Sequence, residues 1–170
     1  MIQVREIITE DVPVINQWRN DPEVMQYLTN QFRYIGLEAD RNWFAYYQQH
    51  RNEAVRLAIL DEGTLVGTVQ LTQIDRMNQQ AEYSIMIGEK NHQSKGLGRQ
   101  ATQAILKHGF LDLNLHRIYL TVLPDNERAI RLYESIGFQR EGIYRKSLFK
   151  NGHFVDVMGM SLLRDEYQIA

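Results

Sequence analysis

Apolar residues recur along this chain with two different periods, and the period predicts the elements. Alternation of apolar and polar residues is typical of strands, whereas apolar residues at every third or fourth position indicate a helix. Glycine, proline and asparagine between these stretches mark turns. The alternating stretches predict strands at 2–8, 54–60, 64–74, 81–88, 117–123, 138–149 and 153–163. The helical spacing predicts helices at 11–19, 37–50, 97–113 and 127–136, with a short one at 22–28.

The order of these elements predicts an α/β (α+β) fold. Three consecutive strands between residues 54 and 88 are joined by short turns, so we expect them to form an antiparallel meander. The strand–helix–strand unit over 81–123 is long enough for a right-handed crossover between parallel strands. Asn151-Gly152 joins the last two strands as a hairpin. We expect one domain over residues 1–170, with a mixed, mainly antiparallel sheet of about seven strands, one central parallel pair and about four helices.

The composition excludes several classes of protein and site. The chain carries 44% hydrophobic and 24% charged residues and a net charge of −2, whereas nucleic-acid-binding proteins usually carry a basic excess. It has no cysteine, which excludes disulfides, thiolate metal sites and a cysteine nucleophile. None of the five histidines has metal-ligand spacing to another, so no metal is expected. Without a signal sequence or an apolar run of the ~20 residues that span a bilayer, we expect a cytoplasmic protein with no membrane partner.

A glycine-bearing turn is the first candidate site. Gln93-Ser94-Lys95-Gly96-Leu97-Gly98 follows a predicted strand and begins a predicted helix. The first N–H groups of a helix have no partner within it and carry positive character, so they bind anions. Gly96 and Gly98 let a ligand approach the backbone, and Lys95 and Arg99 add positive charge. The turn predicts a phosphate-bearing ligand; the alternative is an ordinary loop.

A second candidate lies on helix 127–136, which begins at the same edge of the sheet. Ligands favour the crevice at the carboxyl ends of parallel strands. Asn126 lies in the first turn of this helix, and Tyr133 follows seven residues later on the same face. An amide and a phenol therefore line the crevice into which the glycine turn points. The alternative for Tyr133 is core packing, because Tyr133 also belongs to an apolar stripe with Ala129 and Leu132.

Together the two motifs resemble the GNAT superfamily of N-acetyltransferases. Its signature Gln/Arg-x-x-Gly-x-Gly/Ala matches residues 93–98, and its signature Asn-x-x-Ala-x-x-x-Tyr, followed by Gly-Phe, matches residues 126–133 and Gly137-Phe138. The order of elements along essentially the whole chain also fits. Asn20-Asp21-Pro22-Glu23-Val24 and Phe149-Lys150-Asn151-Gly152 are similar to the branch that contains ribosomal-protein N-terminal and spermidine N-acetyltransferases.

The resemblance implies that acetyl-CoA is the cosubstrate. Its pyrophosphate would accept hydrogen bonds from the backbone N–H groups of Gln93, Ser94, Lys95, Gly96, Leu97, Gly98 and Arg99. Its pantetheine arm would lie along Ile85, Met86 and Ile87, where the two parallel strands splay apart, and a bulge near residues 86–88 would open that gap. Asn126 would hold the arm from the other side. The Lys95 side chain would contact either phosphate or solvent.

The resemblance also implies that a primary amine attacks the thioester directly in a ternary complex. A backbone N–H of strand residues 85–87 would stabilise the oxyanion, and Tyr133 would protonate the departing thiolate. The amine must first lose a proton, since alkyl amines titrate near ~10. Glu82 is our candidate base, acting through water, because it shares a strand face with Ser84 and Met86. Its alternatives are a structural salt bridge and recognition of the amine.

The identity of the acceptor is open among small amines, polyamines, protein N-termini and amino sugars. In this family the acceptor lies over the first helices and the last hairpin. Carboxylates beside aromatic rings there would suit a cationic amine. The candidate acceptor-binding residues are Glu23, Tyr27, Glu38 and Tyr144, with Tyr34, Trp43 and Phe154 nearby. Trp43 also belongs to an aromatic patch with Phe44 and Tyr47, which is either core or a pocket wall.

Two other functions compete with an N-acetyltransferase. A non-catalytic acyl-CoA-binding or sensor domain could use the same fold, although Tyr133 and Glu82 favour the enzyme. A nucleotide-binding protein would need Gly-x-x-x-x-Gly-Lys-Ser/Thr, which the chain lacks. Exposed sheet edges and the habit of the family are compatible with a homodimer.

Overall fold

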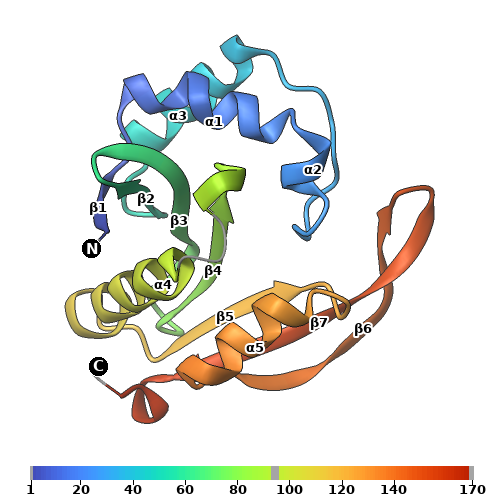
Figure 1. Cartoon of the computed structure of the whole chain (residues 1–170). Helices are drawn as coiled ribbons and strands as arrows, with labels where there is room; N and C mark the ends of the chain where they lie inside the picture. The colour runs from blue at the N-terminus through green and yellow to red at the C-terminus, as the bar shows by residue number, and fades with distance from the viewer. Residues whose placement is uncertain (1, 93–95, 169–170) are drawn as a thin grey trace.

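Seven strands form one mixed sheet in the computed structural model, which describes residues 2–92 and 96–168 (Figure 1). Their order across the sheet is β1-β2-β3-β4-β5-β7-β6, and among these strands only β4 and β5 run parallel. The predicted mixed, mainly antiparallel sheet with one central parallel pair is confirmed. The strands are β1 (Gln3–Glu6), β2 (Val55–Asp61), β3 (Thr64–Asp75), β4 (Gln80–Ile87), β5 (Arg117–Val122), β6 (Gln139–Lys150) and β7 (His153–Leu163).

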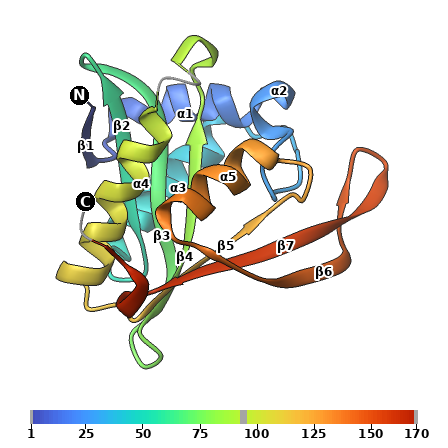
Figure 2. The ribbon, with the colours of Figure 1, turned by 60° about the horizontal axis from the view of Figure 1, so that its bottom comes forward.

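Helices cover both faces of the sheet. α4 and α5 lie on one face, and α1 and α3 lie on the other (Figure 2). The described residues hold five α-helices, which are the four longer helices and the short one that the spacing predicts. The helices are α1 (Val12–Arg19), α2 (Pro22–Met25), α3 (Leu37–Gln49), α4 (Leu97–Lys107) and α5 (Glu127–Ile136).

Two predicted helices end earlier than expected. The helix expected over 22–28 ends at Met25, because the carbonyls of Met25 and Leu28 turn toward the ammonium group of Lys150. The helix expected over 97–113 changes after Lys107 into a π-helical turn, His108–Asp112. Within that turn, a Cβ at Gly109 would lie 2.8 Å from Ile118 Cδ1, so glycine lets the wide turn press against the sheet.

Apolar side chains form one core on each side of the sheet. The larger cluster lies under α4 and α5 and includes Tyr83, Ile105 and Tyr133. The smaller cluster lies under α1 and α3 and includes Trp18, Phe44 and Tyr47. Phe44 and Tyr47 of the predicted aromatic patch are therefore core residues. Both faces of the sheet must be covered because the central strands are apolar on both sides.

The parallel strands separate soon after they meet. Among the described strands, β4 pairs with β5 from Gln80–Arg117 to Glu82–Tyr119, and its remaining residues pair with β3. Directly after Ile87, the N–H groups of Gly88 and Glu89 both donate to the Val66 carbonyl, at 3.0 and 3.2 Å, and this shared acceptor is typical of a β-bulge at the end of the range expected for one. The β3–β4 register is continuous from Gly67–Ile87 to Thr72–Glu82 and shifts only beyond Thr72. The gap opens because β5 diverges from β4 and stays paired with β7 as far as Val122.

Candidate active site

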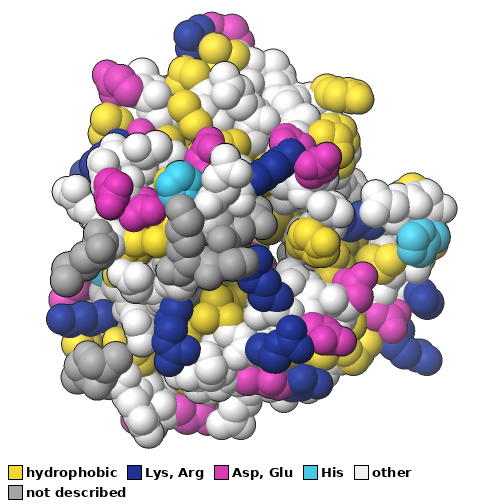
Figure 3. Space-filling model, viewed as in Figure 1, with side chains coloured by type: hydrophobic (Ala, Val, Ile, Leu, Met, Phe, Trp, Pro, Cys, Tyr) yellow, Lys and Arg dark blue, Asp and Glu magenta, His cyan; other side chains and the backbone are white. Residues whose placement is uncertain are grey.

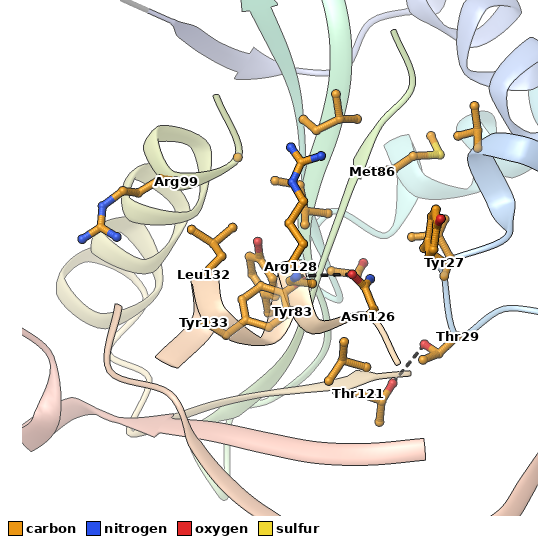
Figure 4. Close-up of a pocket in the computed structure, with 18 of the residues that line it drawn as sticks. Tyr27, Thr29, Tyr83, Met86, Arg99, Thr121, Asn126, Arg128, Leu132 and Tyr133 are labelled. Atoms are coloured by element: carbon orange, nitrogen blue, oxygen red, sulfur yellow. Dashed lines mark hydrogen bonds between the residues drawn. The ribbon is translucent and has the colours of Figure 1, made fainter. Parts of the chain in front are cut away.

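A cavity of about 780 Å³ lies where β4 and β5 separate. Its walls are the second half of β4, the first turn of α4, the end of β5 and the exposed side of α5 (Figure 4). The segment after α2 closes it on the side of Tyr27 and Thr29. The Thr29 and Thr121 hydroxyls hydrogen-bond at 3.0 Å, which fixes that segment to β5. The crevice that the topology predicts is thus present as a cavity.

The first turn of α4 can hold a phosphate group. Gly96 precedes the helix with a φ of 75°, a backbone conformation that favours glycine. A Cβ at Gly96 would meet no atom within 4 Å, so a ligand has room against this backbone. The next backbone bond to the turn is from Gln100 N–H, which leaves the N–H groups of 97–99 without intrahelical partners. Gly96, Leu97, Gly98 and Arg99 all line the cavity, while Gln93, Ser94 and Lys95 lie outside the described residues.

Basic side chains surround this end of the cavity, but the side chain that extends into it is not that of Arg99, which the sequence predicted. Dark-blue side chains gather over α4 and α5 around a hollow on this face (Figure 3). The Arg99 side chain points away from the cavity and donates to Ser135 Oγ at 2.7 Å. Arg128 instead extends into the cavity from the first turn of α5 (Figure 4). Arg128 was missed by the sequence analysis, although its place two residues after Asn126 offered a signal.

Asn126 and Tyr133 line the cavity from the same helix, as their spacing predicts. Asn126 caps α5, because its Oδ1 accepts a hydrogen bond from Ala129 N–H at 3.2 Å. Tyr133 lies two turns further along, and only 7% of its surface is exposed. Its ring packs edge-to-face against Tyr83, with the ring centroids 5.8 Å apart. Tyr133 is therefore both a packed residue and a cavity residue, so the two alternatives from the sequence coexist.

The Tyr133 hydroxyl is strongly perturbed. Burial raises the pKa of Tyr133 to about 12, and a hydrogen bond with Tyr83 opposes part of that rise. The Tyr83 hydroxyl also hydrogen-bonds Thr102 Oγ1 at 2.7 Å, and Thr102 Oγ1 donates to the Gly98 carbonyl at 2.6 Å. These contacts connect the phenol on α5 to the first turn of α4. Sequence analysis missed Tyr83 and Thr102, whose only signal was their place on inward-facing positions.

A second cavity of about 450 Å³ lies on the opposite face of the sheet, beneath α1 and α3. Its walls include Arg19, Trp43, Arg56 and Gln70. The two cavities meet at the middle of β4 and at the segment after α2. Five residues line both: Leu28, Asn30, Ser84, Ile85 and Met86. Two ligands could therefore reach the same stretch of strand from opposite sides.

Glu82 lies on the same face of β4 as the second cavity but does not line either cavity. Its carboxylate accepts a hydrogen bond from Gln73 Nε2 at 3.0 Å, and Gln73 does line the second cavity. Partial burial raises the pKa of Glu82, and the bond from Gln73 opposes the rise. No ion pair of Glu82 is present in the described part of the chain. Of the alternatives, a structural salt bridge thus has no support.

The candidate acceptor-binding residues are spread over the surface. Tyr27 lines the first cavity, whereas Glu23 pairs with Lys90 and lines neither cavity. Glu38 is exposed and pairs with Arg41 at 2.7 Å. Tyr144 is 58% exposed on β6. The structure brings Tyr27 to the site but does not bring Glu38 or Tyr144 to either cavity.

The described residues contain neither a candidate metal site nor a membrane-spanning helix. No cluster of three or more His, Asp or Glu side chains in residues 2–92 and 96–168 could hold a metal ion. Over the same ranges, none of the helices is both long and apolar enough to cross a membrane.

Comparison with known proteins agrees with this geometry. Residues 2–139 match the family described as the acetyltransferase (GNAT) domain. The chain is 33% identical over 169 residues to the uncharacterized N-acetyltransferase p20 of Bacillus licheniformis, which covers 98% of this chain and 94% of that protein. It is 29% identical over 168 residues to the spermidine N(1)-acetyltransferase of Escherichia coli K12, which covers 98% and 88% of the two chains.

A solved structure is similar along nearly the whole chain. It is the spermidine N-acetyltransferase from Vibrio cholerae in complex with CoA and spermine, with a TM-score of 0.92 and 31% sequence identity. The match covers 98% of this chain and 97% of the other. The predicted fold and the predicted resemblance are both confirmed by these findings.

Proposed function

The chain belongs to the GNAT family of N-acetyltransferases, and we propose that it moves the acetyl group of acetyl-CoA to a primary amine by direct attack in a ternary complex. The observation that carries this proposal is the meeting of the two cavities at Ser84, Ile85 and Met86. Reactants that are held in line on either side of one strand gain much of the catalysis from proximity.

The first cavity has the residues that acetyl-CoA needs. The N–H groups of Leu97, Gly98 and Arg99, with any contribution from residues 93–95, would hold the pyrophosphate. Arg128 adds a cation that can pair with phosphate. Ile85, Met86 and Ile87 would line the pantetheine arm, with Asn126 opposite. When bound, acetyl-CoA supplies an activated acyl group and a thiol leaving group.

Tyr133 and Glu82 would move the protons. Because the pKa of Tyr133 is about 12, its phenol is protonated at neutral pH and can donate to the leaving sulfur. Glu82 would take the proton of the amine through water, since it lies on the acceptor side of β4 beside Gln73. A backbone N–H of β4 near Ile85 would stabilise the developing oxyanion.

The acceptor is a primary amine, and the similar enzymes of Escherichia coli and Vibrio cholerae are named for spermidine. We include small amines, polyamines and protein N-termini in the proposal, with Tyr27 as a wall of the site. We also propose a homodimer. The edge strand β6 and its hairpin expose Ile143, Tyr144, Phe149 and Phe154, and the mass of the full chain in solution tests this proposal.

The decisive experiment is a screen for acetyl transfer. Release of the CoA thiol from acetyl-CoA is measured with polyamines, N-terminal peptides and amino sugars as acceptors. We expect at least one acceptor class to accelerate release. Tyr133→Phe should lower kcat about tenfold to a hundredfold with an unchanged CoA affinity. Tyr46→Phe, on an exposed ring of α3, is the matched control and should change neither value.

A different result would identify a sensor. If CoA binds tightly, no amine accelerates thiol release and Tyr133→Phe has no effect, the chain is an acyl-CoA-binding domain without catalysis.

A further inference from the structure

Two arginines face one tryptophan in the second cavity. The Arg56 guanidinium lies 5.0 Å from the centre of the Trp43 ring, and the Arg19 guanidinium lies 5.7 Å from it. Arg19 is paired with the buried carboxylate of Asp40, which also accepts from Asn16 Nδ2 at 2.8 Å. The charge of Arg19 is therefore balanced within the chain.

The charge of Arg56 is not balanced in the same way. In residues 2–92 and 96–168 no carboxylate pairs with Arg56, and none of the described residues that line this cavity is an aspartate or a glutamate. Burial lowers the pKa of Arg56, the neighbouring Tyr47 opposes this shift in part, and Arg19 lowers the pKa further. A cation kept in such surroundings gains most from an anionic partner.

The hydrogen bonds of Arg56 lead to the same conclusion. A guanidinium offers five N–H donors, and the described chain supplies one side-chain acceptor, Gln70 Oε1. Arg56 Nε is buried without a hydrogen-bond partner. Buried donors without partners are rare in folded proteins, so the Arg56 Nε–H group calls for an acceptor from outside the described chain.

A polar row connects Arg56 to the strand at which the cavities meet. Arg56 lies opposite Gln70, and Gln70 lies opposite Ser84 in the next strand pair. Gln70 accepts from Arg56 and donates from Nε2 to Ser84 Oγ at 2.8 Å. Because Arg56 reaches over β3, a group bound to it lies about one strand spacing, ~5 Å, from β4.

We propose that the acceptor amine carries a carboxylate, which Arg56 binds while the amine lies beside Ser84 and Met86. This inference rests on the proposed function and narrows its acceptor class. A carboxylate matches the fork of a guanidinium and would supply the missing acceptors. A polyamine in the same position would place an ammonium group beside the Arg56 guanidinium, which has no carboxylate partner in the described chain and repels it.

Three amines with the same carbon chain test this inference directly. 4-Aminobutanoate, 1,4-diaminobutane and butylamine each have four carbons and differ only at the fourth, which is a carboxylate, a CH2 that bears an ammonium group, or a methyl group. Thiol release is measured for each at saturating acetyl-CoA. We expect kcat/KM for 4-aminobutanoate to exceed that for 1,4-diaminobutane by about tenfold or more.

Substitution of Arg56 assigns the preference to its guanidinium. Arg56→Gln should raise KM for 4-aminobutanoate about tenfold or more and leave butylamine within about threefold. Arg56→Lys keeps the charge and should keep part of the preference, and it also serves if the glutamine variant is unstable. Arg51→Gln removes an exposed guanidinium that pairs with Glu6. This control should leave KM unchanged for both 4-aminobutanoate and butylamine.

A binding measurement separates this inference from the proposed function. With CoA present, 4-aminobutanoate should raise the unfolding temperature of the parent chain but not that of Arg56→Gln. If 1,4-diaminobutane is preferred and Arg56→Gln affects all three amines equally, the carboxylate inference is wrong and the transferase stands. If no amine of any class is acetylated but 4-aminobutanoate still stabilises the chain through Arg56, the transferase fails and the anion site stands. If no amine is acetylated and 4-aminobutanoate does not stabilise the chain, both the proposed function and the carboxylate inference are wrong.

Discussion

Burial determines what the Tyr133 hydroxyl can do. Its pKa of about 12 keeps the phenol protonated across the neutral range. The same value makes it a weaker acid than an alkyl thiol, whose pKa is near ~8.5. Complete proton transfer to sulfur is therefore unfavourable at this pKa, whereas a hydrogen bond from the phenol can stabilise the negative charge that develops on sulfur in the transition state.

Glu82→Gln tests the proposed base through its dependence on pH. The folded-state pKa of Glu82 is raised by burial, so its ionised form is disfavoured by folding. Stability from the protonated form is complete below the unfolded-state pKa and is lost as the pH rises through the higher folded-state pKa. Glu82→Gln should therefore match the parent in unfolding temperature at low pH and equal or exceed it at neutral pH.

Activity gives the second half of that test. If Glu82 is the base, kcat falls in Glu82→Gln and the acidic limb of the pH–rate profile shifts. Glu53→Gln on the exposed surface is the control. If the pH–rate profile of Glu82→Gln is unchanged, Glu82 is not the base, and its carboxylate serves only to accept the hydrogen bond from Gln73.

Side-chain direction was the part of the site that sequence could not predict. The motif spacing placed Gly96, Asn126 and Tyr133 on one cavity, because helix and strand periods determine which positions share a face. Arg99 and Arg128 are on adjacent first turns and look equivalent in sequence. Only the packed structure shows Arg99 turned to Ser135 and Arg128 turned into the cavity.

At the scale of elements, the start of α4 is the feature most directly open to test. Gly96→Asp places negative charge where the pyrophosphate is proposed to bind, and Gly96→Asn places the same shape there without charge. Both variants share the backbone cost of a positive φ, about 1 kcal/mol. We expect calorimetry to show CoA binding weakened about tenfold more by Asp than by Asn. If both variants bind CoA with equal affinity, this turn does not bind the pyrophosphate and is an ordinary loop.

Element types followed from periodicity, whereas two helix ends depended on distant residues. The spacing of apolar residues predicted the strands and the main helices, since each buries one face. The end of α2 depends on Lys150, which is 125 positions from Met25 in sequence. The π-helical turn after Lys107 depends on contacts of Gly109 with Leu71 and Ile118. No local pattern contains such partners.

At the scale of the whole molecule, the first cavity forms where β4 diverges from β5, and the second forms between the sheet and the helices α1 and α3 that cover it. The first followed from topology, because a parallel crossover opens at the carboxyl ends of its strands. The second did not, since Arg19, Trp43 and Arg56 come from three separate elements. The sequence analysis therefore expected acidic acceptor contacts and did not consider a basic cavity.

Lys150 holds the last hairpin against the segment that separates the two cavities. Its ammonium group donates to the carbonyls of Met25 at 3.0 Å, Leu28 at 2.9 Å and Asn30 at 3.0 Å. Only 8% of the Lys150 surface is exposed. Leu28 and Asn30 line both cavities, so this contact sets their common wall.

Lys150→Met should therefore affect both stability and acceptor binding. Methionine keeps much of the apolar length but leaves three carbonyls without their donor, which we expect to cost about 2 kcal/mol in the free energy of unfolding. Denaturant titration measures this loss, and KM for the acceptor should rise while CoA affinity changes little. Lys146→Met is the control, because its ammonium group is exposed and lies 3.9 Å from Asp156, a pair worth less than about 1 kcal/mol. If both variants lose the same stability and retain the same KM, the hairpin does not position the acceptor wall.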